Sequence, residues 1–138
     1  RAPREAAQGT VRPCVADMNG DGRLDIITAN YGTPGLFLGG SDGSWQDAGA
    51  AWGLAVDGRY DSCAPSDIDH DGRPDLYLNG TVTQGRNWPD YLYRNAGTRF
   101  ENVASDAVLA IPADHGVQWA DVDGDGAADL LLTGQGPH

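Results

Sequence analysis

Three acidic segments of the sequence share one spacing that could bind a metal ion. They read DMNGDGRLD at residues 17–25, DIDHDGRPD at 67–75 and DVDGDGAAD at 121–129. Each has aspartate or asparagine at positions 1, 3 and 5, glycine at position 6 and aspartate at position 9. Carboxylates this close repel one another unless a cation draws them together. Oxygens at positions 1, 3 and 5, a backbone carbonyl at position 7 and the carboxylate at position 9 can surround one hard cation.

Calcium is the ion that such a flexible loop suits best, because it accepts about six to eight oxygen ligands. The glycine at position 6 permits the positive φ that turns the chain around the ion. An EF-hand loop needs a glutamate at position 12, where these segments have Thr28, Leu78 and Leu132. We therefore expect calcium loops that are not EF-hands. Asn19 gives the first loop one charge fewer, so we expect weaker binding there.

A competing interpretation is that the three segments are solvated Asp-Gly turns that hold no metal. One copy of the spacing would not separate the two interpretations. Three copies with the same closing aspartate, each leading into an apolar run, favour metal loops.

The composition excludes several classes of partner. The 138 residues carry a formal net charge of −11, which argues against nucleic acid and anionic membrane surfaces as partners. No apolar run approaches the roughly 18 residues of a membrane span, so we expect no membrane insertion. The chain begins Arg1-Ala2-Pro3, from which we expect a mature or trimmed product.

The sequence also repeats between the acidic segments. Residues 35–55 align with 90–110 at an offset of 55, which pairs Leu36 with Tyr91 and Trp45 with Phe100. Short apolar runs bounded by Gly, Asn or Asp are typical of strands. The sequence therefore predicts an all-β fold with units of about four antiparallel strands. The acidic loop joins the first strand of each unit to the second.

These repeats divide the chain into four parts. We predict an N-terminal tail over residues 1–10, a first repeat over 11–58, a second over 59–112 and the first half of a third over 113–138.

The acidic loops, the strands after them and the segment LYRNAGTRFENVA at 92–104 resemble FG-GAP/VCBS-type repeats. Such repeats form β-propeller blades in integrin α-subunit heads and in secreted bacterial proteins, and this chain looks especially similar to ASPIC/UnbV-type proteins. The resemblance implies about two and a half blades of four strands, with calcium bound between the first two strands of each.

The resemblance also implies the ligands of three calcium ions. At each site, four side chains and the backbone carbonyl of position 7 would bind the ion. They are Asp17, Asn19, Asp21, Asp25 and the carbonyl of Arg23; Asp67, Asp69, Asp71, Asp75 and the carbonyl of Arg73; and Asp121, Asp123, Asp125, Asp129 and the carbonyl of Ala127.

The chain departs from the family in the number of its blades. A closed propeller needs about four blades or more, and this chain has two and a half. It could be a fragment of a longer propeller or of an enzyme that contains one, a subunit of a ring, or a subunit of a head-to-tail filament. We expect a structural, self-assembling or adhesive scaffold whose partners are copies of itself, other blades, a glycan or a surface protein.

Neighbouring first strands lie side by side in a propeller, so the resemblance makes a Cys14–Cys63 disulfide plausible. Two buried free thiols are the alternative, and the sequence leaves both open. Calcium loops favour a secreted or cell-surface location, where calcium is plentiful, and that location favours the disulfide.

No residue pattern in the sequence indicates an enzyme. No serine stands in a nucleophile-elbow motif, and neither cysteine has a histidine partner. A lectin-like module is the alternative function, for which Trp88 in the loop at 81–90 is the candidate ligand residue. Asn79 begins an N-glycosylation sequon, NGT.

Overall fold

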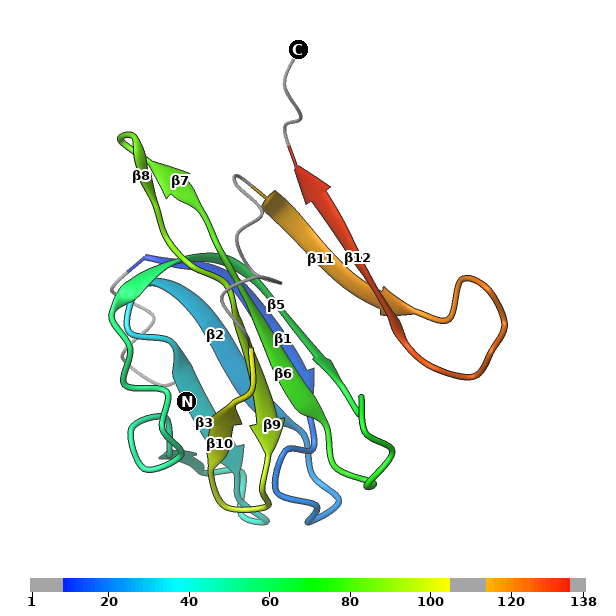
Figure 1. Cartoon of the computed structure of the whole chain (residues 1–138). Helices are drawn as coiled ribbons and strands as arrows, with labels where there is room; N and C mark the ends of the chain where they lie inside the picture. Colours follow the sequence, from blue (N-terminus) through cyan, green and yellow to red (C-terminus); the bar gives the residue numbers. More distant parts are fainter. Residues whose placement is uncertain (1–8, 105–113, 135–138) are drawn as a thin grey trace.

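The protein is described by a computed structural model that covers residues 9–104 and 114–134. This part contains strands and no helix (Figure 1). No element within it is therefore a helix able to cross a lipid bilayer. The predicted tail lies mostly outside these residues, and the first strand already begins at Thr10.

Antiparallel pairing divides the strands into two four-stranded units and a final hairpin. The first unit contains β1 (Thr10–Ala16), β2 (Asp25–Gly32), β3 (Gly35–Gly39) and β4 (Trp45–Asp47). The second contains β5 (Gly58–Ser66), β6 (Asp75–Gly80), β9 (Tyr91–Asn95) and β10 (Phe100–Asn102). The final hairpin pairs β11 (Asp114–Ala120) with β12 (Asp129–Gly134). The prediction of an all-β fold with propeller-type blades of four antiparallel strands is confirmed.

The loop at 81–90, predicted as an insertion, contains a small hairpin of its own. Its strands are β7 (Val82–Thr83) and β8 (Arg86–Asn87), which pair with each other apart from the larger sheet. In Figure 1 this hairpin projects from the end of β6 opposite to the acidic loops.

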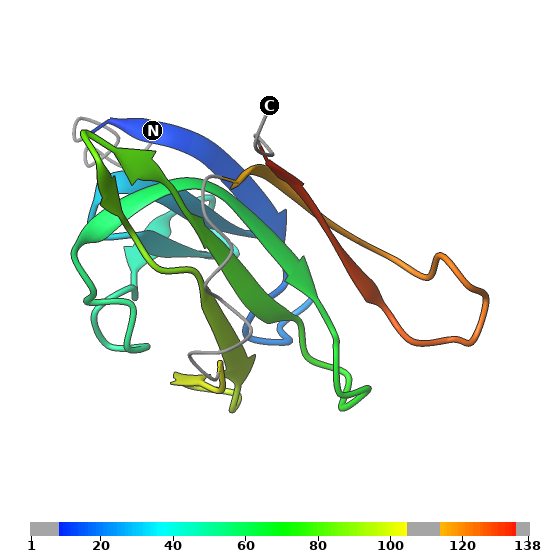
Figure 2. The same cartoon turned by 45° about the horizontal axis from the view of Figure 1, so that its top comes forward.

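The first strands of successive units lie next to one another, β1 beside β5 and β5 beside β11 (Figures 1 and 2). A short pairing of Tyr31 with Arg59 also joins β2 to β5. Cys14 of β1 and Cys63 of β5 form a disulfide, with their Cα atoms 6.1 Å apart. Of the two cysteine states that the sequence left open, the structure contains the disulfide.

The strand register corrects part of the sequence alignment between the two units. An offset of 55 pairs Leu36 with Tyr91, but the residue of β9 that lies at the equivalent point is Leu92, so the offset within this strand is 56. Trp45 and Phe100 keep the offset of 55, because the turn before Trp45 is one residue longer. The difference matters because a slip of one residue exchanges the two faces of a strand.

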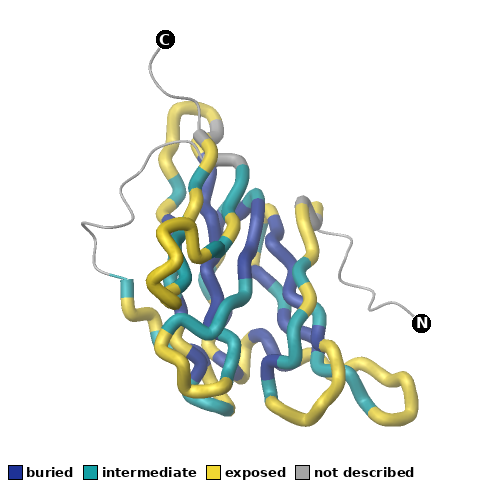
Figure 3. The backbone as a smooth tube through the Cα atoms, turned by 90° about the vertical axis from the view of Figure 1, so that its right-hand side faces the viewer, coloured by how far each residue is buried: buried dark blue, intermediate teal, exposed yellow. Residues whose placement is uncertain are grey.

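The core lies between the two four-stranded units. One buried cluster contains Ile27, Ala29, Leu36, Trp52 and Leu54 of the first unit together with Tyr60, Leu76, Leu78, Tyr93 and Phe100 of the second. Figure 3 shows these buried strands in the middle of the molecule and exposed loops at their ends. Each large apolar side chain buried in this way contributes about 1.5–3 kcal/mol. Neither unit buries this surface alone, so each one stabilises its neighbour.

A smaller contact joins the second unit to the final hairpin. The Trp119 ring lies edge-on to the Tyr77 ring, with centroids 6.3 Å apart, and its Nε1 donates to the Ala64 carbonyl at 3.1 Å. Trp119 therefore packs the final hairpin against the second unit.

We predict that replacing both cysteines, in the variant Cys14→Ser/Cys63→Ser, lowers the free energy of unfolding by about 4 kcal/mol. The chain-entropy model gives this value for a disulfide that closes a loop of this length, since the cysteines are 49 residues apart. Denaturant unfolding with constant calcium measures the change, and reduction of the unmodified protein is the control. A loss below about 1 kcal/mol would contradict the prediction.

Candidate metal sites

Each acidic segment forms the loop between the first two strands of its unit, as the sequence predicts. The first loop is 17–24, the second 67–74 and the third 121–128. In Figure 1 the first two loops lie at the lower ends of their strands, and the third lies at the end of the β11–β12 hairpin. Because paired strands are about 4.8 Å apart, each hairpin brings position 1 and position 9 of its loop close together.

The aspartate at position 1 folds each loop around its own carboxylate. Asp17 Oδ1 accepts a hydrogen bond from the Asp21 amide at 3.1 Å, and Asp17 Oδ2 accepts one from the Gly22 amide at 2.7 Å. The same two bonds recur at Asp67, from Asp71 and Gly72 at 3.0 and 2.9 Å, and at Asp121, from Asp125 and Gly126 at 3.1 and 3.0 Å. A carboxylate has about four acceptor positions, so these bonds leave capacity for a cation.

In the first two units, the aspartate at position 9 links its loop to the third strand. Asp25 is fully buried; its Oδ2 accepts from the Met18 amide at 2.7 Å and its Oδ1 from the Gly39 amide at 2.9 Å. In the second unit, Asp75 accepts from the Ile68 amide at 3.0 Å and the Asn95 amide at 2.7 Å. The third, Asp129, accepts from the Val122 amide at 3.0 Å. Position 9 therefore connects the loop with the sheet, a role that the spacing did not reveal.

Burial also makes the Asp75 carboxyl group harder to ionise. Removal from water raises its pKa, and the negative charges of Asp69 and Asp71 raise it further, while the amides of Asn95 and Ile68 lower it. A cation in the loop would oppose this rise, because a nearby positive charge favours the ionised form.

Two of the loops bring three carboxylates close enough to share one ion. Ligand oxygens of Asp67, Asp69 and Asp71 lie within 4.8 Å of one another, and so do those of Asp121, Asp123 and Asp129. Asp75 and Asp125, which were also predicted as ligands, are not members of these groups. In the first loop, Asn19 Nδ2 donates to Asp21 Oδ2 at 2.8 Å, so positions 3 and 5 are also neighbours there.

The arginine at position 7 interacts with the loop through its side chain. Arg23 pairs with Asp21, and its Nε donates to the Gly39 carbonyl at 2.7 Å. Arg73 pairs with Asp71 in the same way and donates to the Asn95 carbonyl at 3.1 Å. Sequence reasoning assigned a role only to the carbonyls of these residues. The third loop has Ala127 at this position, so no guanidinium of its own offsets its carboxylates.

The backbone of the loops requires positive φ at position 4 as well as at position 6. Gly72 has a φ of 86°, as its position predicts, and His70 at position 4 has a φ of 59°. The other loops have glycine at both positions, and φ is positive at each of Gly20, Gly22, Gly124 and Gly126. The repeated glycine at position 4 could have revealed this requirement from the sequence.

The residues of the loops fit calcium. The available ligands are carboxylate, amide and backbone oxygens, which are the ligands of hard cations. The loops also contain the thioether of Met18, which is fully buried in the core, and the imidazole of exposed His70. The clustered oxygens belong mainly to exposed residues, which a calcium ion can reach.

Two further residues predicted as sites occupy environments that do not favour those roles. The guanidinium of Arg86 lies over the Trp88 ring, 3.8 Å from its centroid, and so covers one face that a sugar would need. Asn79 is fully buried, where its amide bonds Ser62 and Asp90. The folded chain leaves no room for a glycan on Asn79.

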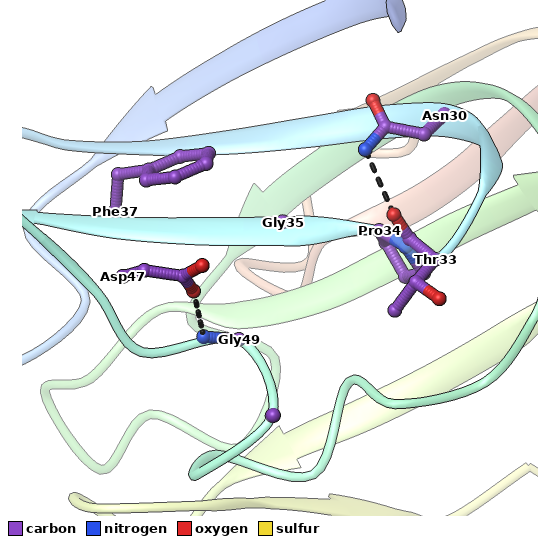
Figure 4. Close-up of a pocket in the computed structure, with 8 residues that line it drawn as sticks. Asn30, Thr33, Pro34, Gly35, Phe37, Asp47 and Gly49 are labelled. Carbon is purple, nitrogen blue, oxygen red and sulfur yellow. Dashed lines mark hydrogen bonds between the residues drawn. The ribbon is translucent and has the colours of Figure 1, made fainter. Parts of the chain in front are cut away.

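A hollow of about 290 Å³ opens on the side of the first unit that faces away from the core (Figure 4). It forms because Gly35 stands where the second unit has Tyr91. Its polar groups already serve local turns: Asn30 donates to the Thr33 carbonyl at 2.8 Å, and Asp47 accepts from the Gly49 amide at 3.1 Å.

We predict that His70→Gly raises the free energy of unfolding by about 0.5–1 kcal/mol. A side chain at positive φ costs about 1–2 kcal/mol, which the flexibility of glycine in the unfolded chain partly offsets. Thermal unfolding measures the change. Gly72→Ala is the matched control and should be destabilising; its new Cβ would meet no atom within 4 Å, so its cost is conformational alone. A destabilised His70→Gly variant would contradict the prediction.

Comparison with protein families gives two matches to one model, the FG-GAP-like repeat. The matches cover residues 17–78 and 81–132, which together contain all three acidic loops. A search of the curated proteins finds no match to this chain.

Proposed function

The chain belongs to the FG-GAP-like repeat family, and we propose that it is a calcium-binding, propeller-type repeat module with a structural role outside the cell. The observation that carries the proposal is the clustering of aspartate oxygens within 4.8 Å in the second and third loops.

Electrostatics explains why such loops need an ion. Two like charges 4 Å apart repel by about 1 kcal/mol in water and about 4 kcal/mol near a protein surface. The ligand oxygens of Asp67, Asp69 and Asp71 lie within 4.8 Å of one another. Without a calcium ion, Arg73 beside Asp71 and Arg94 beside Asp69 offset only part of their repulsion. A calcium ion replaces three repulsions with attractions to a common centre.

Calcium would be held by the side chains at positions 1, 3, 5 and 9 of each loop and by the carbonyl at position 7. Bound there, it would supply positive charge and fix the turn between two strands. The proposal assigns no catalysis to the chain and no partner among nucleic acids or membranes.

Two features support a secreted or cell-surface location. Calcium is abundant outside cells, and the disulfide between Cys14 and Cys63 is stable in oxidising compartments.

Exposed apolar residues on the final hairpin support a scaffold role. Met18 and Ile27 are fully buried against the second unit. The residues at the same repeat positions of the hairpin, Val122 and Leu131, are 65% and 42% exposed. We propose that another unit, from a second copy or another chain, covers them as the second unit covers the first.

We predict that removing calcium with a chelator lowers the melting temperature. One site contributes about 3 kcal/mol when calcium is present at a hundredfold excess over its dissociation constant. Asp69→Asn should reduce the calcium-dependent shift. The matched control Asp42→Asn, an exposed aspartate outside the loops, should leave the shift unchanged. Equal melting temperatures with and without calcium would contradict the metal sites.

We also predict that light scattering in calcium gives a molar mass that is a multiple of the 14.5 kDa chain, and that chelation lowers it. Leu131→Asp should abolish the assembly, because it places a charge on the exposed face. The control Val82→Asp, which changes a valine of similar exposure on β7 (39%), should not. A 14.5 kDa species in calcium would contradict self-association but leave calcium binding intact.

A further inference from the structure

Asn95 is the last residue of β9, is fully buried and uses every polar group that it has. Its backbone amide donates to Asp75 Oδ1 at 2.7 Å, and its carbonyl accepts from Arg73 Nε at 3.1 Å. Its side-chain oxygen accepts from the Gly97 amide at 2.8 Å. A buried polar side chain with this many bonds has one fixed orientation.

The side-chain nitrogen of Asn95 contacts two acidic loops at once. Nδ2 donates to the Met18 carbonyl in the first loop at 2.8 Å and to the Pro74 carbonyl in the second at 2.9 Å. These two residues are 77 and 21 positions away in the sequence. Asn95 is therefore a bridge between the metal loop of its own unit and that of the preceding unit.

The bridge continues to the position 9 aspartates of both loops. The Met18 amide donates to Asp25 Oδ2 at 2.7 Å, and the Asn95 amide donates to Asp75 Oδ1. One line of hydrogen bonds thus joins Asp25, Met18, Asn95 and Asp75. All four residues are at most 1% exposed, so water does not compete for these bonds.

We propose that Asn95 is a positioning residue that couples calcium binding in the first and second loops. The inference rests on the proposed calcium function. An ion that orders one loop also fixes Met18 or Pro74, and through Asn95 it removes part of the cost of ordering the other loop. The coupling is reciprocal, so each ion raises the affinity of the other loop by the same factor.

The third loop provides an internal comparison. Ile68 of the second loop and Val122 of the third stand at the repeat position of Met18. Within residues 9–104 and 114–134, no side chain donates a hydrogen bond to the carbonyl of Ile68 or Val122 as Asn95 does to that of Met18. The third loop should therefore bind calcium independently of the other two.

The first unit indicates which residue can replace Asn95 without loss of the backbone bonds. Gly39 occupies the position of Asn95 in the first unit, where its amide donates to Asp25 and its carbonyl accepts from Arg23. The backbone bonds of this position therefore form without a side chain. Asn95→Gly keeps the backbone link to Asp75 and removes the bridge together with the side-chain bond to the Gly97 amide. Asn95→Ala is the second variant.

Calcium titration by calorimetry tests the coupling. All proteins in the titration carry Asp123→Ala and Asp125→Ala, which disable the third loop. The calcium affinity of the second loop is then measured twice, with the first loop intact and with the first loop disabled by Asp21→Ala. With Asn95 present, loss of the first loop should weaken the second about fivefold or more, the usual lower range of such couplings. In the Asn95→Gly and Asn95→Ala variants, disabling the first loop should change the calcium affinity of the second loop less than twofold. Asn102→Ala, which removes an exposed amide of β10, should retain the full coupling.

Each failure has a different meaning. An equal loss of affinity with and without Asn95, or no loss in either, would overturn the coupling while leaving calcium binding in place. Absence of calcium binding at every loop would overturn the proposed function itself. Calcium affinity of the third loop, measured in the Asn95 variants with that loop intact, should stay unchanged. A cooperative thermal unfolding transition in calcium shows that the variants are folded.

Discussion

The structure depends on the aspartate that closes each acidic loop, which is buried in the first two loops, at Asp25 and Asp75. A buried carboxylate is costly unless hydrogen bonds satisfy it, and Asp25 is fully buried with one oxygen bound to its loop and the other to the third strand. The conformation of the loop and the pairing of the strands therefore form together. This explains how a turn dense in negative charge can remain ordered at the end of a sheet.

Three further contacts connect the first two units with each other. The apolar cluster between the first two units contains side chains from both, the disulfide ties their first strands, and Asn95 ties their loops. Each unit is thus completed by the next one along the chain. Met18, which the second unit covers, is fully buried, whereas Val122 at the same repeat position of the final hairpin is 65% exposed. The difference shows how much burial a neighbouring unit contributes.

The parts of this account that depend on spacing could be predicted from the sequence, and the parts that depend on contacts between distant residues could not. Alternating apolar runs and the acidic repeat predicted strands with loops between the first two, because those patterns are local. The offset of Leu36 was wrong by one residue, because only strand pairing fixes the register. The arginine side chains, the role of Asp25 as a link and the bridge from Asn95 were missed, since each joins segments that are separate in the sequence. The positive φ of His70 was missed although the glycines at the same position of the other loops indicated it.

The central claim is that the three acidic loops bind calcium ions, in the second and third loops through the clustered aspartates. Equilibrium dialysis with radioactive calcium, at a protein concentration well above the dissociation constants, counts the bound ions directly. The account predicts three ions per chain, with the weakest of them assigned to the first loop because Asn19 replaces an aspartate there. A chain that retains no calcium at millimolar concentration would contradict the account.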